Sequence, residues 1–215
     1  MRLNPIAIRL VILSDTHGKH WSLRVPDGDI LLHAGDLTRD GTADDLEDFN
    51  SYLSTLPHRH KIVIAGNHDF CLEREPEINA AIITNAIYLR DRAVTVEGIK
   101  FYGSPWQPWF FDWAFNLQRG EEIRAKWDLI PLDTDVLITH GPAYGILDKT
   151  MRGARVGCED LLEAIMRIRP RLHVFGHIHE AYGMHSNDDI SFINGSNCNV
   201  KFELVNPPIV QIFDR

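Results

Sequence analysis

Short apolar runs, bounded by glycine, proline or polar residues, recur along the chain. Runs of this kind between turn-forming residues predict buried β-strands. We expect strands at residues 6–13, 29–34, 61–66, 135–140, 171–176, 190–194 and 209–213. Residues 93–104 predict two further strands, joined by a turn at Glu97 and Gly98.

Apolar residues at three- and four-residue steps predict helices between several of these strands. The clearest pattern covers residues 42–56, whose acidic beginning suits a helix N-terminus. Another covers residues 158–169 and stops at Pro170, and shorter helices are expected at 76–86 and 118–127. Strands that alternate with helices predict the α/β class, and the extra hairpins suggest a second sheet. Since no repeat or low-complexity linker interrupts the pattern, we expect one domain over residues 1–215.

The composition is that of an ordinary soluble globular protein, with 44% hydrophobic and 24% charged residues. The formal net charge of −8 offers no general positive field, so we expect no stable nucleic-acid partner. Three widely spaced cysteines, without a C-x-x-C pair, favour a reducing compartment over a disulfide framework.

The N-terminal apolar run is interrupted by Arg9, and no small-residue cleavage site follows it, so we do not expect a signal peptide. No stretch approaches the roughly 18 apolar residues of a membrane span. We therefore expect a cytoplasmic protein without a membrane partner, and leave a homo-oligomer open.

Polar residues beside glycine follow five of the predicted strands. They are Asp15 and His17 in SDTHG, Asp36 in AGDLTRDG, Asn67, His68 and Asp69 in AGNHDF, His140 in HGP, and His177 and His179 in GHIH. In open α/β sheets, ligands bind beyond the carboxyl ends of the strands. Each segment alone is a weak signal, but five in succession are difficult to assign to packing. We expect these side chains to meet at one site.

The pair His177 and His179 on its own could be either two metal ligands or two ordinary loop histidines. Beside the other strand ends, the pair becomes part of a metal cluster. Imidazole and carboxylate donors without thiolate suit Mn, Fe, Zn or Ni rather than Mg alone. Seven donors exceed the three or four protein ligands of one zinc, and they suit two ions that share a carboxylate. We expect two divalent metal ions, Mn²⁺ first, with Fe, Zn, Ni or Mg as alternatives.

The order D-x-H, G-D, G-N-H-D, H, G-H-x-H, which spans residues 15–179, resembles the calcineurin-like metallophosphoesterase superfamily. Segments 103–120, 139–148, 169–183 and 193–200 resemble the metallophosphoesterase-domain-containing branch, whose members have been linked to hydrolysis of cyclic nucleotide phosphodiesters. Some members of that branch lack one histidine of the last motif, whereas this chain has both.

The resemblance implies a fold, a reaction and a role for each residue. The fold is two packed mixed β-sheets flanked by helices, an α/β/β/α sandwich. The reaction is phosphodiester hydrolysis by attack of metal-bound hydroxide. Asp15, His17 and His179 would hold the first metal; Asn67, His140 and His177 the second; Asp36 would bridge them. His68 would contact the phosphate or protonate the leaving oxygen, with Asp69 orienting it. The expected substrate is a small-molecule phosphoester of the nucleotide type.

Two other functions stay open. One is a phosphomonoesterase, including a protein phosphatase, although G-D-L-T-R-D here differs from the G-D-x-x-D-R of that branch. The other is a catalytically weak metal-binding scaffold, against which the complete ligand set and His68 argue.

The aromatic run at 105–115 either packs or forms a rim on which a base stacks. We expect substrate contacts from Asn67, His68 and Trp106. The remaining histidines receive plainer interpretations: His33 and His173 are expected to be structural, and His58 and His60 to be solvated.

Overall fold

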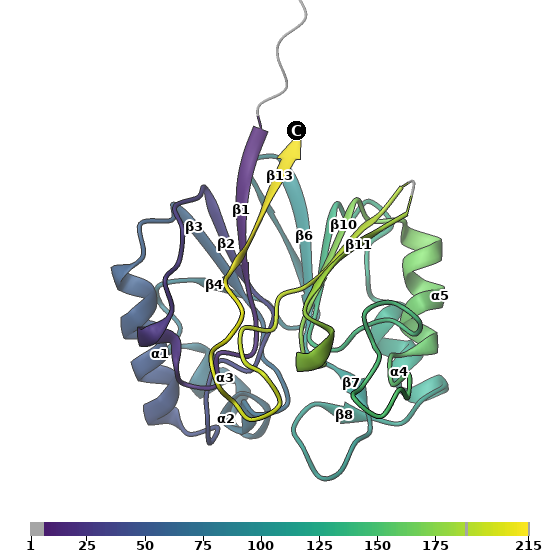
Figure 1. Ribbon diagram of the computed structural model, residues 1–215, viewed down its shortest axis with the longest axis horizontal. Coiled ribbons are helices and arrows are strands. Elements are labelled where there is room, and N and C mark those ends of the chain that lie inside the picture. The colour runs from purple at the N-terminus through teal and green to yellow at the C-terminus, as the bar shows by residue number, and fades with distance from the viewer. Residues whose placement is uncertain (1–6, 188, 215) are drawn as a thin grey trace, which may run out of the picture.

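The computed structural model describes residues 7–187 and 189–214, and within them two β-sheets pack face to face (Figure 1). The first sheet has the order β13-β1-β2-β3-β4. Its strands are β13 (Ile209–Asp214), β1 (Ala7–Leu13), β2 (Ile30–His33), β3 (His60–Val63) and β4 (Ile87–Tyr88). The strands β1 to β4 are parallel and β13 is antiparallel to β1, so four carboxyl ends share one edge.

The second sheet has the order β11-β12-β10-β9-β6-β5. Its strands are β11 (Gly183–Ser186), β12 (Ser191–Asn194), β10 (Leu172–Phe175), β9 (Val136–Thr139), β6 (Ile99–Ser104) and β5 (Arg92–Val96). The four inner strands are parallel, and an antiparallel strand closes each edge. A separate parallel pair consists of β7 (Gln107–Pro108) and β8 (Asn116–Leu117).

The main core lies between the two sheets, and helices cover their outer faces. Buried aliphatic residues of the first sheet, such as Leu10 and Ile62, belong to one cluster with Ile138 and Val174 of the second. Helices α1 (Ala43–Thr55), α2 (Phe70–Arg74) and α3 (Pro76–Ala80) lie beside the first sheet, and α4 (Glu121–Trp127) and α5 (Glu159–Ile168) beside the second. The layers follow the order α/β/β/α, and the expected fold class is confirmed.

Local sequence signals account for the best-predicted elements. The Thr42 side chain accepts a hydrogen bond from the Asp45 amide at 3.1 Å, and the Asp45 carboxylate accepts one from the Thr42 amide, a reciprocal cap that starts α1. Glu97 and Gly98 form the β5–β6 turn with φ of 49° and 76°, as two-residue hairpin turns require.

Other elements differ from the expectation. The helix expected at 76–86 stops at Ala80, and the amides of Thr84 and Asn85 instead donate to Asn50 of α1. The helix expected at 118–127 starts only after Gly120, whose φ is 86°. The elements α2, β4, β7, β8 and β11 were not expected, because segments of two to five residues carry too few positions to show a period. Ile6, expected to open the first strand, lies outside the described residues.

The expected solvation of His58 is wrong. Its side chain is buried and donates from Nε2 to the Pro26 carbonyl at 3.1 Å. His60 is half-buried, with Nε2 3.2 Å from Glu97, so it is only partly solvated. Within the described residues, no helix combines the length and the apolar character needed to cross a membrane.

Candidate metal centre and active site

The carboxyl ends of the parallel strands of both sheets point toward the lower half of the view in Figure 1. Backbone hydrogen bonds hold these ends together: the Asp15 amide donates to the Gly35 carbonyl, and the Gly176 amide to the His140 carbonyl. The His177 amide donates to both carboxylate oxygens of Asp15, at 3.1 and 3.0 Å. The first strand of one sheet is thereby tied to the last motif of the other.

Four of the expected site residues have left-handed backbone. The φ angles are 54° at Asp15, 45° at His17, 55° at Asp36 and 68° at His177. Positive φ is unfavourable for residues with a Cβ atom, and such residues cluster at functional sites. The left-handed backbone at these four residues turns the chain sharply at the strand ends, and their side chains lie among the other strand ends.

Glycines beside these residues make room for their side chains. A Cβ atom on Gly66 would lie 2.3 Å from Asp36 Oδ1 and 2.6 Å from His140 Cε1. A Cβ atom on Gly176 would lie 2.1 Å from Asp15 Oδ2. Glycine at both positions therefore permits close approach of ligand side chains, beyond any effect on turn geometry.

One group of donor atoms comes from Asp15, His17 and His179. The Nε2 atoms of the two histidines lie 3.2 Å apart, and His179 Nε2 is also 3.2 Å from Asp15 Oδ1. His179 Nδ1 donates to the Asn199 carbonyl at 2.9 Å, which leaves the Nε2 lone pair facing the group. Two lone pairs and a carboxylate that converge in this way fit a divalent cation.

A second group surrounds His140. Its Nδ1 donates to the Ala34 carbonyl at 2.9 Å, which turns Nε2 toward Asn67 Oδ1 at 2.9 Å. The ring of His177 lies 5.0 Å from that of His140, centroid to centroid. Nitrogen and oxygen donors of this kind again fit a divalent cation.

Asp36 stands between the two groups. Its Oδ2 lies 3.7 Å from His17 Nε2 and 3.4 Å from His140 Nε2. Its other oxygen accepts a hydrogen bond from the His68 amide at 2.8 Å. A carboxylate in this position can serve both groups at once.

The electrostatics of the cluster favour added positive charge. Burial alone would raise the pKa of Asp15, but His179, with His140 and His17, holds that pKa well below its ordinary value. Burial would lower the pKa of His140 and of His179, but the carboxylates outweigh it and raise both to about 9. The two carboxylates therefore favour the protonated forms of His140 and His179. Bound divalent cations would supply the same positive charge.

The other two histidines are held neutral. Burial lowers the pKa of His17 to about 4 and that of His177 to about 3. A neutral imidazole keeps the lone pair that metal binding requires. The donor chemistry of the cluster thus fits divalent metal ions.

His68 lies at the edge of the cluster, half-exposed. Its Nδ1 is 3.3 Å from the Arg39 carbonyl, to which it donates. Its ring lies 4.3 Å from the Trp113 ring at a tilt of 34°, and the rings of His17 and Phe202 lie at 4.5 and 5.7 Å. The His68 ring is therefore held between the rings of Trp113 and His17, and the exposed part of the side chain borders a cavity.

The expected pairing of His68 with Asp69 is wrong. Both Asp69 oxygens accept hydrogen bonds from backbone amides, at 2.7 Å from Gly66 and 2.9 Å from Thr38, and the Thr38 hydroxyl donates at 2.7 Å. The buried carboxylate therefore joins the loops that follow β2 and β3. Adjacent residues in a turn point in different directions, so the carboxylate never reaches the imidazole beside it in sequence. The Arg39 carbonyl orients His68 instead.

Trp106, from which a substrate contact is expected, borders neither cavity beside the cluster. Its Nε1 donates to Asp91 at 2.8 Å, and the cations of Arg90 and Lys126 lie over its ring at 5.5 and 4.5 Å. It packs against Phe115. The aromatic residue beside the candidate active site is Trp113, which the sequence signalled only as one of six aromatics in an irregular segment.

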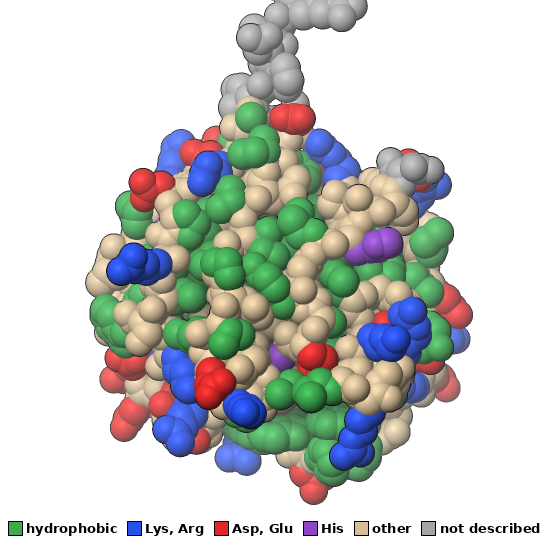
Figure 2. Space-filling view, viewed as in Figure 1, with side chains coloured by type: hydrophobic (Ala, Val, Ile, Leu, Met, Phe, Trp, Pro, Cys, Tyr) green, Lys and Arg blue, Asp and Glu red, His purple; other side chains and the backbone are tan. Residues whose placement is uncertain are grey.

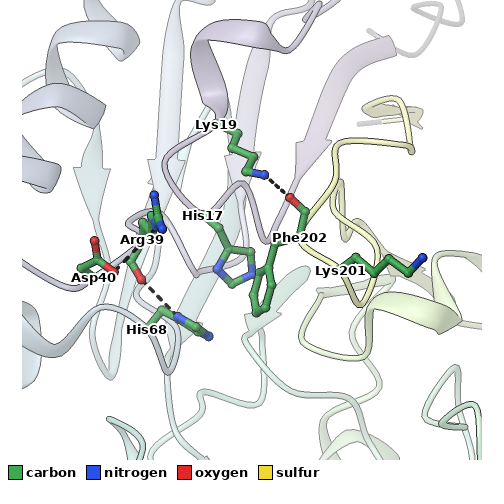
Figure 3. Close-up of a pocket in the computed structure, with 7 residues that line it drawn as sticks. All are labelled: His17, Lys19, Arg39, Asp40, His68, Lys201 and Phe202. Atoms are coloured by element: carbon green, nitrogen blue, oxygen red, sulfur yellow. Dashed lines mark hydrogen bonds and ion pairs between the residues drawn. The ribbon is translucent and has the colours of Figure 1, made fainter.

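A cavity of about 430 Å³ opens over His17 and His68. Figure 3 shows its remaining lining residues, which are Lys19, Arg39, Asp40, Lys201 and Phe202. The Lys19 ammonium donates to the Phe202 carbonyl. Sequence reasoning did not identify Lys19, Lys201 or Phe202; only the position of Lys19, two residues after His17, could have suggested it.

Comparison with known proteins agrees with this geometry. A model of the family described as calcineurin-like phosphoesterase matches residues 8–181. Human metallophosphoesterase domain-containing protein 1 is 45% identical over 233 residues, with 96% of this chain and 71% of that protein covered. A UPF0046 protein of Caenorhabditis elegans is 39% identical over 217 residues, with 94% and 74% covered. A solved structure that is 13% identical covers 97% of this chain at a TM-score of 0.66, which supports the fold alone.

Proposed function

The chain belongs to the calcineurin-like phosphoesterase family, whose members are metal-dependent phosphoester hydrolases, and from that premise we propose that it hydrolyses phosphodiesters of the nucleotide type. Cyclic nucleotides are the first candidates. The observation that carries the proposal is the position of Asp36 between two groups of metal donors, beside a clamped and half-exposed His68.

The donor groups divide the ligands between two ions. Asp15, His17 and His179 form the first set; Asn67, His140 and His177 form the second; Asp36 is shared. Imidazole, amide and carboxylate donors without thiolate suit Mn²⁺ first, with Fe, Zn, Ni or Mg as alternatives. When bound, such ions neutralise phosphate oxygens and make water nucleophilic near neutral pH.

His68 has the position of a proton donor. Because Nδ1 donates to the Arg39 carbonyl, the protonated ring presents its second proton on Nε2. A ring nitrogen of His68 lies within 4.8 Å of donor atoms of His17 and Asp36, near enough for a metal ion as well as for a phosphate bound at the proposed ions. We assign it to the phosphate because its side chain is half-exposed at the edge of the cluster. An imidazolium there can protonate a departing alkoxide.

Two openings beside the cluster favour a diester over a monoester. One is the 430 Å³ cavity on the His68 side, and the other is a cavity of about 340 Å³ bordered by His177. A phosphodiester has two ester oxygens with carbon substituents, which are joined through the ribose in a cyclic nucleotide, and a single negative charge, so it can use both openings. A monoester would fill only one of them.

The three cysteines, Cys71, Cys158 and Cys198, are buried and free. Free thiols suit a reducing environment, and on this ground we place the proposed activity in the cytoplasm. The proposed substrate there is a small-molecule phosphoester.

Turnover of p-nitrophenyl esters tests the proposal. With Mn²⁺ present, the purified protein should cleave bis-p-nitrophenyl phosphate faster than p-nitrophenyl phosphate, and it should cleave cyclic nucleotides. Faster cleavage of the monoester would favour a phosphatase. No cleavage of either ester, with metal bound, would indicate a binding scaffold.

Substitution of His68 tests the role of this residue. His68→Ala should keep its metals and lose about 10²–10⁴ in turnover of cyclic nucleotides, whose alkoxide leaving group needs a proton. Turnover of bis-p-nitrophenyl phosphate should fall much less, because p-nitrophenolate leaves without one. His185→Ala, at an exposed histidine of β11, is the matched control and should lose nothing. Equal losses on both substrates would reject the acid role, and loss of metal would show that His68 is a ligand.

A further inference from the structure

The cavity on the His177 side differs in character from the one over His68. Besides His177, it is bordered by aromatic and aliphatic groups, among them Trp109, Phe110, Pro142 and Val156. The His68 side carries the three cations of Lys19, Arg39 and Lys201 and one carboxylate, that of Asp40, which lies 3.8 Å from Arg39, so its net charge is positive. The two openings therefore offer different chemistry to the two arms of a diester.

The aromatic wall is exposed although its side chains are large. Trp109 is 54% and Phe110 51% exposed. The Phe110 ring lies 6.4 Å from the His177 ring at 86°, so the wall adjoins a proposed metal ligand. Figure 2 shows hydrophobic side chains gathered at the lower end of the molecule, where Figure 1 places the loop between β7 and β8. Exposed apolar surface of this kind, beside an active site, is typical of ligand binding.

The backbone holds this wall in place. The Trp109 amide donates to the Leu117 carbonyl at 2.8 Å, in the short β7–β8 pair. The Asn116 side chain donates to the carbonyls of Phe110 at 3.2 Å and Phe111 at 2.8 Å. The rings are therefore presented from a fixed loop, which lowers the entropy cost of stacking a ligand on them.

The donors among the polar groups of the cavity are already engaged, and acceptors remain: the Thr150 hydroxyl, for example, donates to the Ala154 carbonyl. The cavity's guanidinium, that of Arg119, already donates to the carbonyls of Gly157 and Val156 and to a carboxylate. Glu180 brings a negative charge. Gln107 is buried, and its Oε1 has no hydrogen-bond partner among residues 7–187 and 189–214. The cavity therefore suits a neutral ring that bears N–H donors and disfavours an anion.

We propose that this cavity binds a flat, amino-bearing heterocycle, such as a nucleobase, on the organic group that stays esterified to the phosphate after hydrolysis. In a cyclic nucleotide this group is the nucleoside, which keeps one of its two ester bonds. The proposal rests on the proposed function, in which His68 faces the leaving oxygen at the other opening. The retained group then extends toward His177, where Trp109 and Phe110 stack on its ring and Glu180 accepts from its amino group.

Two diesters that share a leaving group but differ in the retained arm measure the contribution of that arm to kcat/KM. Phenyl p-nitrophenyl phosphate and methyl p-nitrophenyl phosphate both react with water to release p-nitrophenolate, and they keep a phenyl or a methyl arm. Trp109→Ser and Phe110→Ser should each lower kcat/KM for the phenyl ester about 10-fold relative to the methyl ester, the range expected for one stacked ring. Since the two esters differ in intrinsic reactivity, the readout is the change in their ratio from wild type to variant.

Trp21→Ser is the matched control. Trp21 is as exposed as Trp109, at 54%, but its ring packs on Tyr52, its Nε1 donates to Asp48 at 3.0 Å, and it borders neither cavity. It should leave the ratio of the two esters unchanged. An unchanged ratio in both test variants, or an equal change in Trp21→Ser, would overturn the inference while the diesterase function stands. No cleavage of either ester by the wild type would instead reject the proposed function.

Inhibition by nucleotides provides a second measurement. Adenosine 5′-monophosphate and purine riboside 5′-monophosphate differ only in an amino group. The first should compete more strongly against the methyl ester in wild type, and Glu180→Gln should reduce the difference. Equal inhibition by both nucleotides in wild type would reject the amino-bearing ring. If Trp109→Ser failed to turn over substrate, unchanged binding of adenosine 5′-monophosphate by this variant would reject the stacking role.

Discussion

Strands β2 and β10 each carry a buried polar residue inside the strand and another just beyond it, and the two positions behave differently. Inside the strands, His33 Nε2 lies 3.0 Å from the Thr16 hydroxyl, and His173 Nε2 lies 2.8 Å from the Thr139 hydroxyl. Each has one neutral partner. Beyond the strands lie Asp36 and His177, with positive φ and other donors facing them. Burial alone therefore does not distinguish a histidine proposed as a metal ligand from a structural one.

The charges that the two regions tolerate also differ. Burial lowers the pKa of both His33 and His173 to about 3, so the strand interiors exclude a cation. At the strand ends the values are mixed: carboxylates raise the pKa of His140 and His179 to about 9 against the same burial, whereas burial lowers that of His17 to about 4 and that of His177 to about 3. On the β10 segment, His173 thus excludes positive charge, whereas His179, beyond the end of the strand, attracts it.

Asp36→Asn should have the largest effect on activity. The change keeps the size of the side chain but removes the charge that both donor groups share. Diester hydrolysis should fall by about 10³-fold, which is the upper range for loss of one electrostatic stabiliser. Initial rates at saturating Mn²⁺ provide the measurement. The strand-interior control, His173→Gln, should keep its rate, and a comparable loss there would erase the distinction between the two regions.

Asn67→Ala should have a smaller effect that excess metal relieves. Asn67 offers a neutral oxygen 2.9 Å from His140 Nε2, so its loss weakens one of the two groups. Affinity for the second ion should fall about 10- to 100-fold, the range seen when metal-site partners are removed. Titration with Mn²⁺ should restore part of the rate. A rate that stays low at every Mn²⁺ concentration would contradict a ligand role.

Acid should destabilise the strand interiors. Since the folded-state pKa of His173 is about 3 and the unfolded value about 6.5, its contribution to stability is complete above pH 6.5 and is lost as the pH falls toward 3. The loss is about 1.4 kcal/mol per pH unit for each such histidine. His173→Gln removes one of these groups, so its unfolding free energy should fall less steeply between pH 6.5 and 4.5. Urea unfolding at several pH values measures both slopes, and parallel slopes would contradict this account.

The sequence predicted the positions at which each strand stops, because those signals are local. A strand that ends in glycine beside Asp, Asn or His places that side chain at the sheet edge whatever the distant contacts are. Asp15, Asp36 and His140 were found in this way. The layered fold followed from the strand–helix alternation and from the family resemblance.

Contacts that depend on the direction of a side chain could not be predicted. Asp69 follows His68 in sequence, yet backbone amides from two loops capture its carboxylate. In the irregular aromatic segment no period shows which ring turns inward. The sequence therefore does not reveal that Trp113, rather than Trp106, lies beside the site. The burial of His58 could not be predicted either, because its hydrogen-bond partner is the Pro26 carbonyl, 32 residues away, and the local sequence pattern does not reveal it.

Metal content tests the central claim most directly, namely that the strand ends form one centre for two ions that share Asp36. Protein saturated with Mn²⁺ and freed of excess metal should hold two ions per chain by elemental analysis. His173→Gln should also hold two, and Asp36→Asn should hold one or none. One ion per chain in the fully active wild type, or two tightly held ions in Asp36→Asn, would contradict the account.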